Sequence, residues 1–267
     1  MQVFADDGAR IDVRVGGRDG DCAVVLIHGF PLAREIWTAQ FEAATRSRRV
    51  VLPDLRGFGS SSVAQGPYLM ERLAADVAAV LDALGIERAA IAGHSMGGYV
   101  AMAFARMYAE RVAGIALVAS RLRADTPQEA AARRELADRV EREGSIAPAV
   151  QAYLPRMIAR PPSATRPELL EEIERISARN SAGGAAAALR GMALRSASDD
   201  IAEDLDVPMA MIAGACDAIV GIDEARAVAG SFARGRLYVC ERSGHLPMLE
   251  EPECVSRALA SWLEAAR

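Results

Sequence analysis

Ser95 lies in the segment GHSMG at positions 93–97, which has the pattern G-x-S-x-G. The motif follows the apolar run Ala89–Ala92, typical of a buried strand, and precedes Gly97–Tyr108, which has helical spacing. A tight turn from strand to helix exposes the serine hydroxyl, and flanking glycines avoid side-chain collisions there. We predict that Ser95 is a nucleophile, the alternative being a glycine-rich helix start that Ser95 caps.

A serine is a weak nucleophile unless a neighbouring base takes its proton. The chain has three histidines, at positions 28, 94 and 245. We expect the side chain of His94 to diverge from the adjacent serine, and His28 to organise the loop after an early strand. A serine on such a turn takes its acid and then its base from later in the chain. His245 is therefore the predicted base, and the alternative is a histidine that caps a loop.

The third member of a serine triad is a carboxylate that accepts a hydrogen bond from the histidine Nδ1–H. Asp217 follows the predicted strand Met209–Ala213 and is the predicted acid. Asp223 and Glu224 fit better in the first turn of the next helix, and no carboxylate directly follows the predicted strand Gly114–Ala119. Two backbone N–H groups, of Phe30 and Met96, are expected to stabilise a developing oxyanion.

Short apolar runs alternate with helical patterns, which predicts an α/β fold with a parallel sheet. An antiparallel hairpin is predicted around Asp7-Gly8. The predicted strands are Gln2–Ala5, Arg10–Val15, Ala23–Ile27, Val50–Leu52, Ala89–Ala92, Gly114–Ala119, Met209–Ala213 and Leu237–Cys240. The predicted helices outside residues 121–199 are Leu69–Leu84, Gly97–Tyr108 and Pro252–Ala266.

Residues 121–199 have no strand-like run and are rich in arginine, glutamate and alanine. Four helices are predicted there, at Gln128–Glu143, Ile146–Ile158, Pro167–Arg179 and Ala185–Ala197, with breaks at Pro161-Pro162 and Gly183-Gly184. We expect a helical cap at 121–199 over a core formed by 1–120 and 200–267. Arg121, Met157 and Met192 are candidate substrate-binding residues; an arginine would suit a carboxylate on the substrate, unless it only solvates a helix face.

The amino-acid composition excludes some classes of protein function. Of 267 residues, 51% are hydrophobic and 25% charged, which is a globular balance. The net charge of −5 gives no support to nucleic-acid binding. All 31 basic residues are arginines, so Schiff-base, PLP and P-loop chemistry is excluded.

We expect neither a targeting segment nor a membrane span. Its first residues lack a basic and then apolar leader, and no apolar stretch approaches the ~20 residues of a membrane span. The four cysteines, Cys22, Cys216, Cys240 and Cys254, are far apart, so we expect free thiols and a cytoplasmic protein.

Several segments together resemble the α/β-hydrolase superfamily: HGFP at 28–31, DLRGFGSS at 54–61, GHSMGG at 93–98, GACD at 214–217 and GH at 244–245. Within this superfamily, the chain is similar to small capped carboxylesterases, enol-lactonases and cofactor-free haloperoxidase-like hydrolases. The resemblance implies an eight-stranded, mostly parallel sheet with helices on both faces and a helical cap after strand 6. It also implies Ser95, Asp217 and His245 as the triad. Relatives often carry acidic residues before the triad Asp and prolines after it, whereas this chain has Ala215-Cys216 and Gly221-Ile222.

The predicted reaction is acyl transfer to water, with a small ester or lactone as the substrate. We expect no cofactor or metal, no nucleic-acid or membrane partner, and a monomer or homodimer. Two alternatives stay open: C–C bond hydrolysis or perhydrolysis by the same triad, and a ligand sensor with little turnover.

Overall fold

The computed structural model describes residues 1–18, 22–159 and 167–266. Its strands form an eight-stranded sheet in the order β1-β2-β4-β3-β5-β6-β7-β8. The pairs β1/β2 and β2/β4 are antiparallel and the others parallel, so both the α/β class and the N-terminal hairpin are confirmed. The strands are β1 (Gln2–Phe4), β2 (Arg10–Gly16), β3 (Ala23–Ile27), β4 (Val50–Pro53), β5 (Ala89–His94), β6 (Val112–Val118), β7 (Met209–Gly214) and β8 (Gly235–Cys240).

The central strands are apolar along their whole length because both faces of the sheet are covered. Successive side chains of a strand point to opposite faces. In β3, Val24 and Leu26 belong to one buried cluster, and Val25 and Ile27 belong to the other. A strand of this kind reads in the sequence as a continuous apolar run rather than an alternating one.

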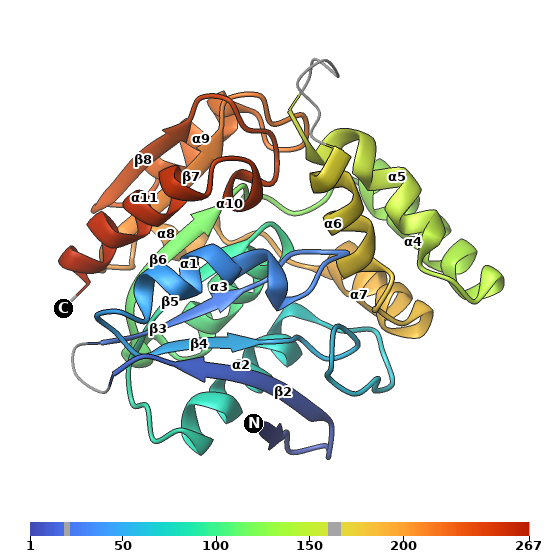
Figure 1. Cartoon of the computed structure of the whole chain (residues 1–267), viewed down its shortest axis with the longest axis horizontal. Coiled ribbons are helices and arrows are strands. Elements are labelled where there is room, and N and C mark those ends of the chain that lie inside the picture. Colours follow the sequence, from blue (N-terminus) through green and yellow to red (C-terminus); the bar gives the residue numbers. More distant parts are fainter. Residues whose placement is uncertain (19–21, 160–166, 267) are drawn as a thin grey trace.

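Helices pack on both faces of the sheet. One buried cluster includes residues of α1 (Thr38–Ala44), α10 (Pro247–Glu250) and α11 (Pro252–Ala265), and α1 and α11 lie in front of the sheet in Figure 1. The other cluster includes residues of α2 (Met70–Ala83), α3 (Met96–Met107), α8 (Asp199–Ala202) and α9 (Ile222–Gly230). Two single 3₁₀ turns, Arg34–Trp37 and Ala109–Arg111, complete these layers.

Four of the five helices described between β6 and β7 lie in the segment predicted as a cap. They are α4 (Pro127–Glu143), α5 (Ala147–Met157), α6 (Pro167–Ser177) and α7 (Ala182–Leu194), and we call them the cap helices. Figure 1 shows them grouped at one side of the sheet. The helix α4 begins with a capping box between Thr126 and Glu129. The predicted break at Pro161-Pro162 lies outside the described residues, and the exact division into core and cap stays a prediction.

Some short elements were not predicted. The helices α1, α8 and α10 have seven residues or fewer, too short for a clear helical period. Of the described helices, none is long and apolar enough to cross a membrane.

The expectation of four free thiols is wrong. Cys240, at the end of β8, forms a disulfide with Cys254 on α11, with the two Cα atoms 6.0 Å apart. The pairing is a contact of the folded chain that no local cysteine motif signals. It removes the support that free thiols gave to a reducing compartment, so the cytoplasmic location stays a prediction.

Candidate active site

Ser95 occupies the turn between β5 and α3 in a backbone conformation that residues other than glycine rarely adopt. Its φ is 48° and its ψ is −111°. Such a conformation persists only where the surroundings hold it. Here the Ser95 N–H donates to the Val118 carbonyl at 2.9 Å, and the Ser120 hydroxyl donates to the Ser95 carbonyl at 2.8 Å. The end of β6 therefore fixes the turn that presents the serine.

The glycines of the motif are required by close backbone contacts. A Cβ atom on Gly93 would lie 2.0 Å from the Gly97 carbonyl oxygen. A Cβ atom on Gly97 would lie 2.4 Å from the carbonyl oxygen of Ile27 at the end of β3. Both distances are far inside van der Waals contact, so the G-x-S-x-G spacing follows from how tightly β5, α3 and β3 meet.

His245 lies between Ser95 and Asp217 and is in hydrogen-bond contact with both. Its Nδ1 is 2.8 Å from Asp217 Oδ2, and its Nε2 is 2.9 Å from Ser95 Oγ. With the proton on Nδ1, the ring donates to the carboxylate and its Nε2 accepts from the serine hydroxyl. The structure thus brings the three predicted residues together in the order that a general-base mechanism needs.

Asp217 is oriented by the backbone as well as by His245. Its Oδ1 accepts hydrogen bonds from the N–H groups of Ile219 at 2.7 Å and Val220 at 3.0 Å. Only Oδ2 is left to face the histidine. The residues before it are also held, because the Ala215 and Cys216 N–H groups donate to carbonyls in the chain from Cys240 to Ser243. The loop lacks the acidic residues and prolines common in relatives, yet it is firmly hydrogen-bonded.

The other two histidines are buried. His94 Nε2 is 2.8 Å from the His245 carbonyl, so it must donate, and its Nδ1 has no partner among the described residues. His28 Nε2 accepts from the Leu55 N–H, so its Nδ1–H donates to the Gly29 carbonyl. Burial holds the pKa of both rings below the ordinary histidine value, and the neighbouring His245 lowers that of His94 further.

The predicted oxyanion donors lie on segments that meet at the serine. Met96 is the first residue of α3, so its N–H is one of the four that have no partner within the helix. Phe30 follows β3, and its buried ring makes edge contacts with Phe58 and with Tyr153 of α5. The contact with Tyr153 brings a cap helix against this loop.

The three predicted substrate-binding residues have different surroundings. Arg121 forms ion pairs with Glu224 at 3.1 Å and Glu129 at 3.5 Å, so its charge is already matched. Met157 is buried, and its carbonyl accepts the His245 N–H at 2.8 Å. Met192 is buried, with Sδ 3.6 Å from Arg133 Nη1. Their roles in substrate binding stay predictions.

A charged cluster under the cap helices was not predicted. Arg133 of α4 and Arg195, which follows α7, both pair with Asp125, each with a closest distance of 2.6 Å. Arg133 also donates to the Tyr153 hydroxyl at 2.8 Å. Burial alone would raise the pKa of the Asp125 carboxyl, but the hydrogen bonds and charges of the two arginines hold it below its ordinary value. Arg133 is one of many arginines in the cap sequence, and only the fold singles it out.

A further link between cap and core was also missed. Asn180, between α6 and α7, donates to the Pro31 carbonyl at 2.7 Å and accepts the Gly59 N–H at 2.7 Å. One cap side chain therefore holds both the Phe30 loop and the glycine-rich loop after β4. Side-chain bonds to distant backbone leave no periodic signal in a sequence.

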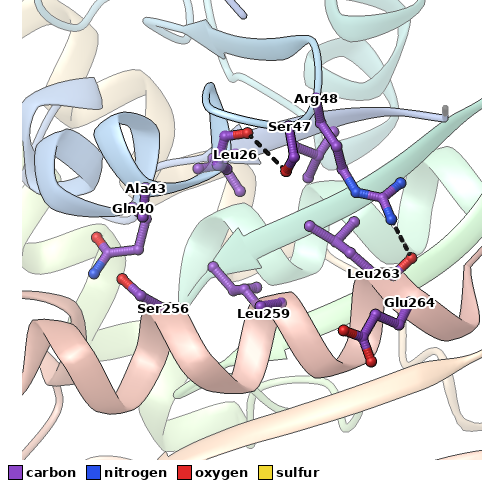
Figure 2. A pocket seen from close by; sticks show the side chains of 12 residues that line it. Leu26, Gln40, Ala43, Ser47, Arg48, Ser256, Leu259, Leu263 and Glu264 are labelled. Carbon is purple, nitrogen blue, oxygen red and sulfur yellow. Dashed lines mark hydrogen bonds between the residues drawn. The ribbon is translucent and has the colours of Figure 1, made fainter. Parts of the chain in front are cut away.

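A cavity of about 300 Å³ lies elsewhere, between α1 and α11. Figure 2 shows Arg48 reaching across it to the Leu263 carbonyl, at 2.8 Å. The cavity reaches Leu26 of β3, but none of its lining residues belongs to the triad. It is therefore separate from the candidate active site.

Comparisons with known proteins identify the same fold family. The model of the alpha/beta hydrolase fold family matches residues 23–252. A thermophilic esterase from Thermogutta terrifontis, solved with malate bound, has a TM-score of 0.94 and 37% identity, over 100% of this chain and 98% of that one. The enol-lactonase from Burkholderia xenovorans has a TM-score of 0.90 and 25% identity, over 99% and 100%. The 3-oxoadipate enol-lactonase 2 of Acinetobacter baylyi is 27% identical, over 89% of this chain and 86% of the relative.

Proposed function

The chain belongs to the alpha/beta hydrolase fold family, and from this premise we propose that it is a serine hydrolase of small carboxylic esters or lactones. The observation that carries the proposal is the chain of contacts from Asp217 through His245 to Ser95, at 2.8 and 2.9 Å. Esterases and enol-lactonases among the similar structures support the substrate class. Membership of this family supports a hydrolase activity.

In the first half of the reaction, Ser95 Oγ attacks the carbonyl carbon of the substrate as His245 Nε2 takes the hydroxyl proton. The carbonyl oxygen becomes an oxyanion, for which the N–H groups of Phe30 and Met96 are the proposed donors. Asp217 holds the ring and stabilises the positive charge that it gains. The protonated His245 then gives its proton to the leaving alkoxide oxygen, the C–O bond breaks, and the acyl group stays on Ser95.

In the second half, a water molecule takes the place of the alcohol. His245 removes a proton from the water as its oxygen attacks the acyl carbon. The bond to Ser95 Oγ breaks, and the serine recovers its proton from His245. With a lactone the alcohol is part of the same molecule, so the product is a single hydroxy acid.

We further propose that the substrate carries a carboxylate. Arg133 and Arg195 share one carboxylate, Asp125, so in the described part of the chain this cluster has one positive charge in excess. Arg133 contacts Tyr153, and Tyr153 contacts Phe30 beside the proposed oxyanion site. A guanidinium on this side of the site suits a substrate carboxylate. The malate in the similar esterase structure supports the same chemistry.

The decisive experiment labels the protein with a fluorophosphonate and follows the hydrolysis of p-nitrophenyl acetate. We expect the label on Ser95, and at least a ~10³-fold loss of kcat in Ser95→Ala. Ser47→Ala, which changes an exposed serine on the α1 side, is the matched control. Labelling at another residue, or unchanged hydrolysis by Ser95→Ala, contradicts the proposal.

Product analysis then addresses the competing reactions. A lactone should give a hydroxy acid, and an ester should give an acid and an alcohol. A diketone should give no product, and peroxide should give no peracid. Turnover of a diketone would favour C–C hydrolysis, and peracid formation would favour perhydrolysis. Labelling of Ser95 without turnover of any of these compounds would favour the ligand sensor.

A further inference from the structure

Glu250 joins the loop that carries His245 to the cap. This residue ends α10, and we call residues 241–246, between β8 and α10, the His245 loop. One carboxylate oxygen, Oε1, accepts the Gly244 N–H at 2.8 Å. The other oxygen, Oε2, accepts the N–H of Ala159, just beyond the end of α5, also at 2.8 Å. A single side chain therefore satisfies backbone donors from two segments that are 85 residues apart in the chain.

The same two segments also meet directly. The His245 N–H donates to the Met157 carbonyl at 2.8 Å. A Cβ atom on Gly244 would lie 2.6 Å from the Ala159 nitrogen and 2.7 Å from the Ile158 carbonyl carbon. Only a residue without a side chain allows this approach. The base is thus held by cap residues 157–159 through its own backbone and through that of its neighbour.

The triad does not explain these contacts. Asp217 orients the imidazole ring through Nδ1, whereas Glu250 and Met157 hold the backbone on which the ring is mounted. The neighbouring Glu251 offers a contrast, because the partner of its carboxylate among the described residues is Arg242, within the His245 loop. Of these two adjacent acids, Glu250 is the one that reaches the cap.

We propose that Glu250 is a positioning residue that couples the seating of the cap segment 157–159 to the placement of His245 against Ser95. The inference rests on the proposed hydrolase function. The carboxylate does not touch the reacting atoms; it acts through Gly244. When the cap segment leaves its seat, Glu250 loses the Ala159 N–H that helps to orient its carboxylate toward Gly244, and the His245 backbone loses the Met157 carbonyl. His245 Nε2 is then no longer held at hydrogen-bond distance from Ser95 Oγ.

The first test compares Glu250→Ala and Glu250→Gln with Glu251→Ala as the matched control. On p-nitrophenyl acetate, Glu250→Ala should lower kcat by about 10- to 100-fold with KM within about threefold, because the base is misplaced by a fraction of an ångström. Glu250→Gln should fall between this variant and the wild type, since the two N–H groups contact different carboxylate oxygens and one of them would face the amide NH₂ group instead. Glu251→Ala should keep kcat within about twofold, since its carboxylate does not reach the cap.

The second test does not depend on turnover. Amide-resolved hydrogen exchange should show faster exchange at both Ala159 and Gly244 in Glu250→Ala, and at neither in Glu251→Ala. Gly244→Ala gives an independent variant, because its Cβ separates the same segments without removing the carboxylate. It should lower kcat and speed exchange at Ala159 in the same way.

Three results would overturn the inference. These are a kcat of Glu250→Ala within twofold of the wild type, a loss in Glu251→Ala as large as in Glu250→Ala, and faster exchange at Ala159 alone. If the wild-type protein neither turns over esters nor is labelled at Ser95, the hydrolase proposal fails instead. The exchange experiment then still decides whether Glu250 joins the cap to the His245 loop.

Discussion

The hydroxyl of Ser120 donates a hydrogen bond to the backbone carbonyl of Ser95 at 2.8 Å, so the strand next to the nucleophile helps to hold its turn. Ser120 is fully buried and directly follows Ala119, which like Ser95 has a positive φ. The neighbouring strands β5 and β6 therefore end in two constrained turns that support each other.

Removing the Ser120 hydroxyl should weaken this support. We expect Ser120→Ala to lower the free energy of unfolding by about 0.5–1.5 kcal/mol, the usual value of one buried hydrogen bond, and to lower kcat as well. Urea unfolding and ester hydrolysis measure the two effects. Ser47→Ala removes an exposed hydroxyl and should change the stability by no more than about 0.5 kcal/mol. Equal effects of the two variants would show that Ser120 does not support the turn.

Asp217→Asn should be nearly inactive although its shape is conserved. The Ile219 and Val220 N–H groups require an acceptor at Oδ1, so the amide oxygen must lie there and the NH₂ group must face His245. His245 Nδ1 must then accept, which puts the ring proton on Nε2, toward Ser95. We expect a loss of about 10⁴-fold in kcat on p-nitrophenyl acetate. Asp223→Asn, an exposed change nearby, should be active; comparable rates for both variants would exclude Asp217 from the triad.

Stability should fall as the pH decreases from about 7.5 to 5.5. Burial lowers the pKa of His28 and His94 in the folded protein, while in the unfolded chain both groups take up protons near pH 6.5. The unfolded state then binds more protons, so the free energy of unfolding decreases below that pH by up to about 1.4 kcal/mol per pH unit for each histidine. Urea unfolding across this range measures the slope. His94→Gln should make it shallower, and an unchanged slope would contradict the role of His94.

The disulfide predicts a thiol count and a stability difference. Unreduced, unfolded protein should give two reactive thiols per chain, because two of the four cysteines are paired. Cys254→Ser removes a bridge between residues 14 apart and should lower the free energy of unfolding by roughly 3 kcal/mol. Cys216→Ser, an exposed change outside the bridge, should leave it unchanged. Four reactive thiols in protein purified without reductant would contradict the pairing.

Substrate preference should depend on Arg133. If it binds a carboxylate, a half-ester of a dicarboxylic acid should be a better substrate than its neutral diester. Arg133→Gln should reduce this preference, as a ratio of kcat/KM values, by about 10- to 100-fold. Arg139→Gln on the same helix, an exposed arginine paired with Glu143 at 2.8 Å, should keep the preference. Equal preference in both variants would place the carboxylate site elsewhere.

The arrangement of Ser95, Asp217 and His245 could be predicted because each residue lies shortly after a strand of the sheet, within five residues of its end. The runs that end near Ser95, Asp217 and His245 became β5, β7 and β8, and strand ends of a parallel sheet lie at one edge. The helix-rich segment after β6 was equally clear from its lack of strand-like runs. Local pattern and chain order were sufficient for these features.

The supports of the site could not be predicted in this way. Ser120, Asn180 and Glu250 each bond to backbone groups far away in the chain. Backbone groups are the same in nearly every residue, so the sequence does not show which of them a given side chain will contact. Cys240 and Cys254 are brought together by the packing of α11 beside β8. Nothing in the local sequence distinguishes Arg133 from the neighbouring arginines of α4. It is set apart by its contacts with Asp125 and Tyr153 in the folded chain.

Two hydrogen bonds join described cap residues to the segment from His245 to Glu250, and both use main-chain atoms of the cap. Met157 contributes its carbonyl and Ala159 its N–H, so neither bond depends on which side chains these positions carry. Mutations can therefore change cap side chains without removing the bonds that hold the backbone of His245. Variants with different side chains in the cap helices, whether natural or made in the laboratory, can therefore differ in substrate range and still keep His245 in the same position relative to Ser95.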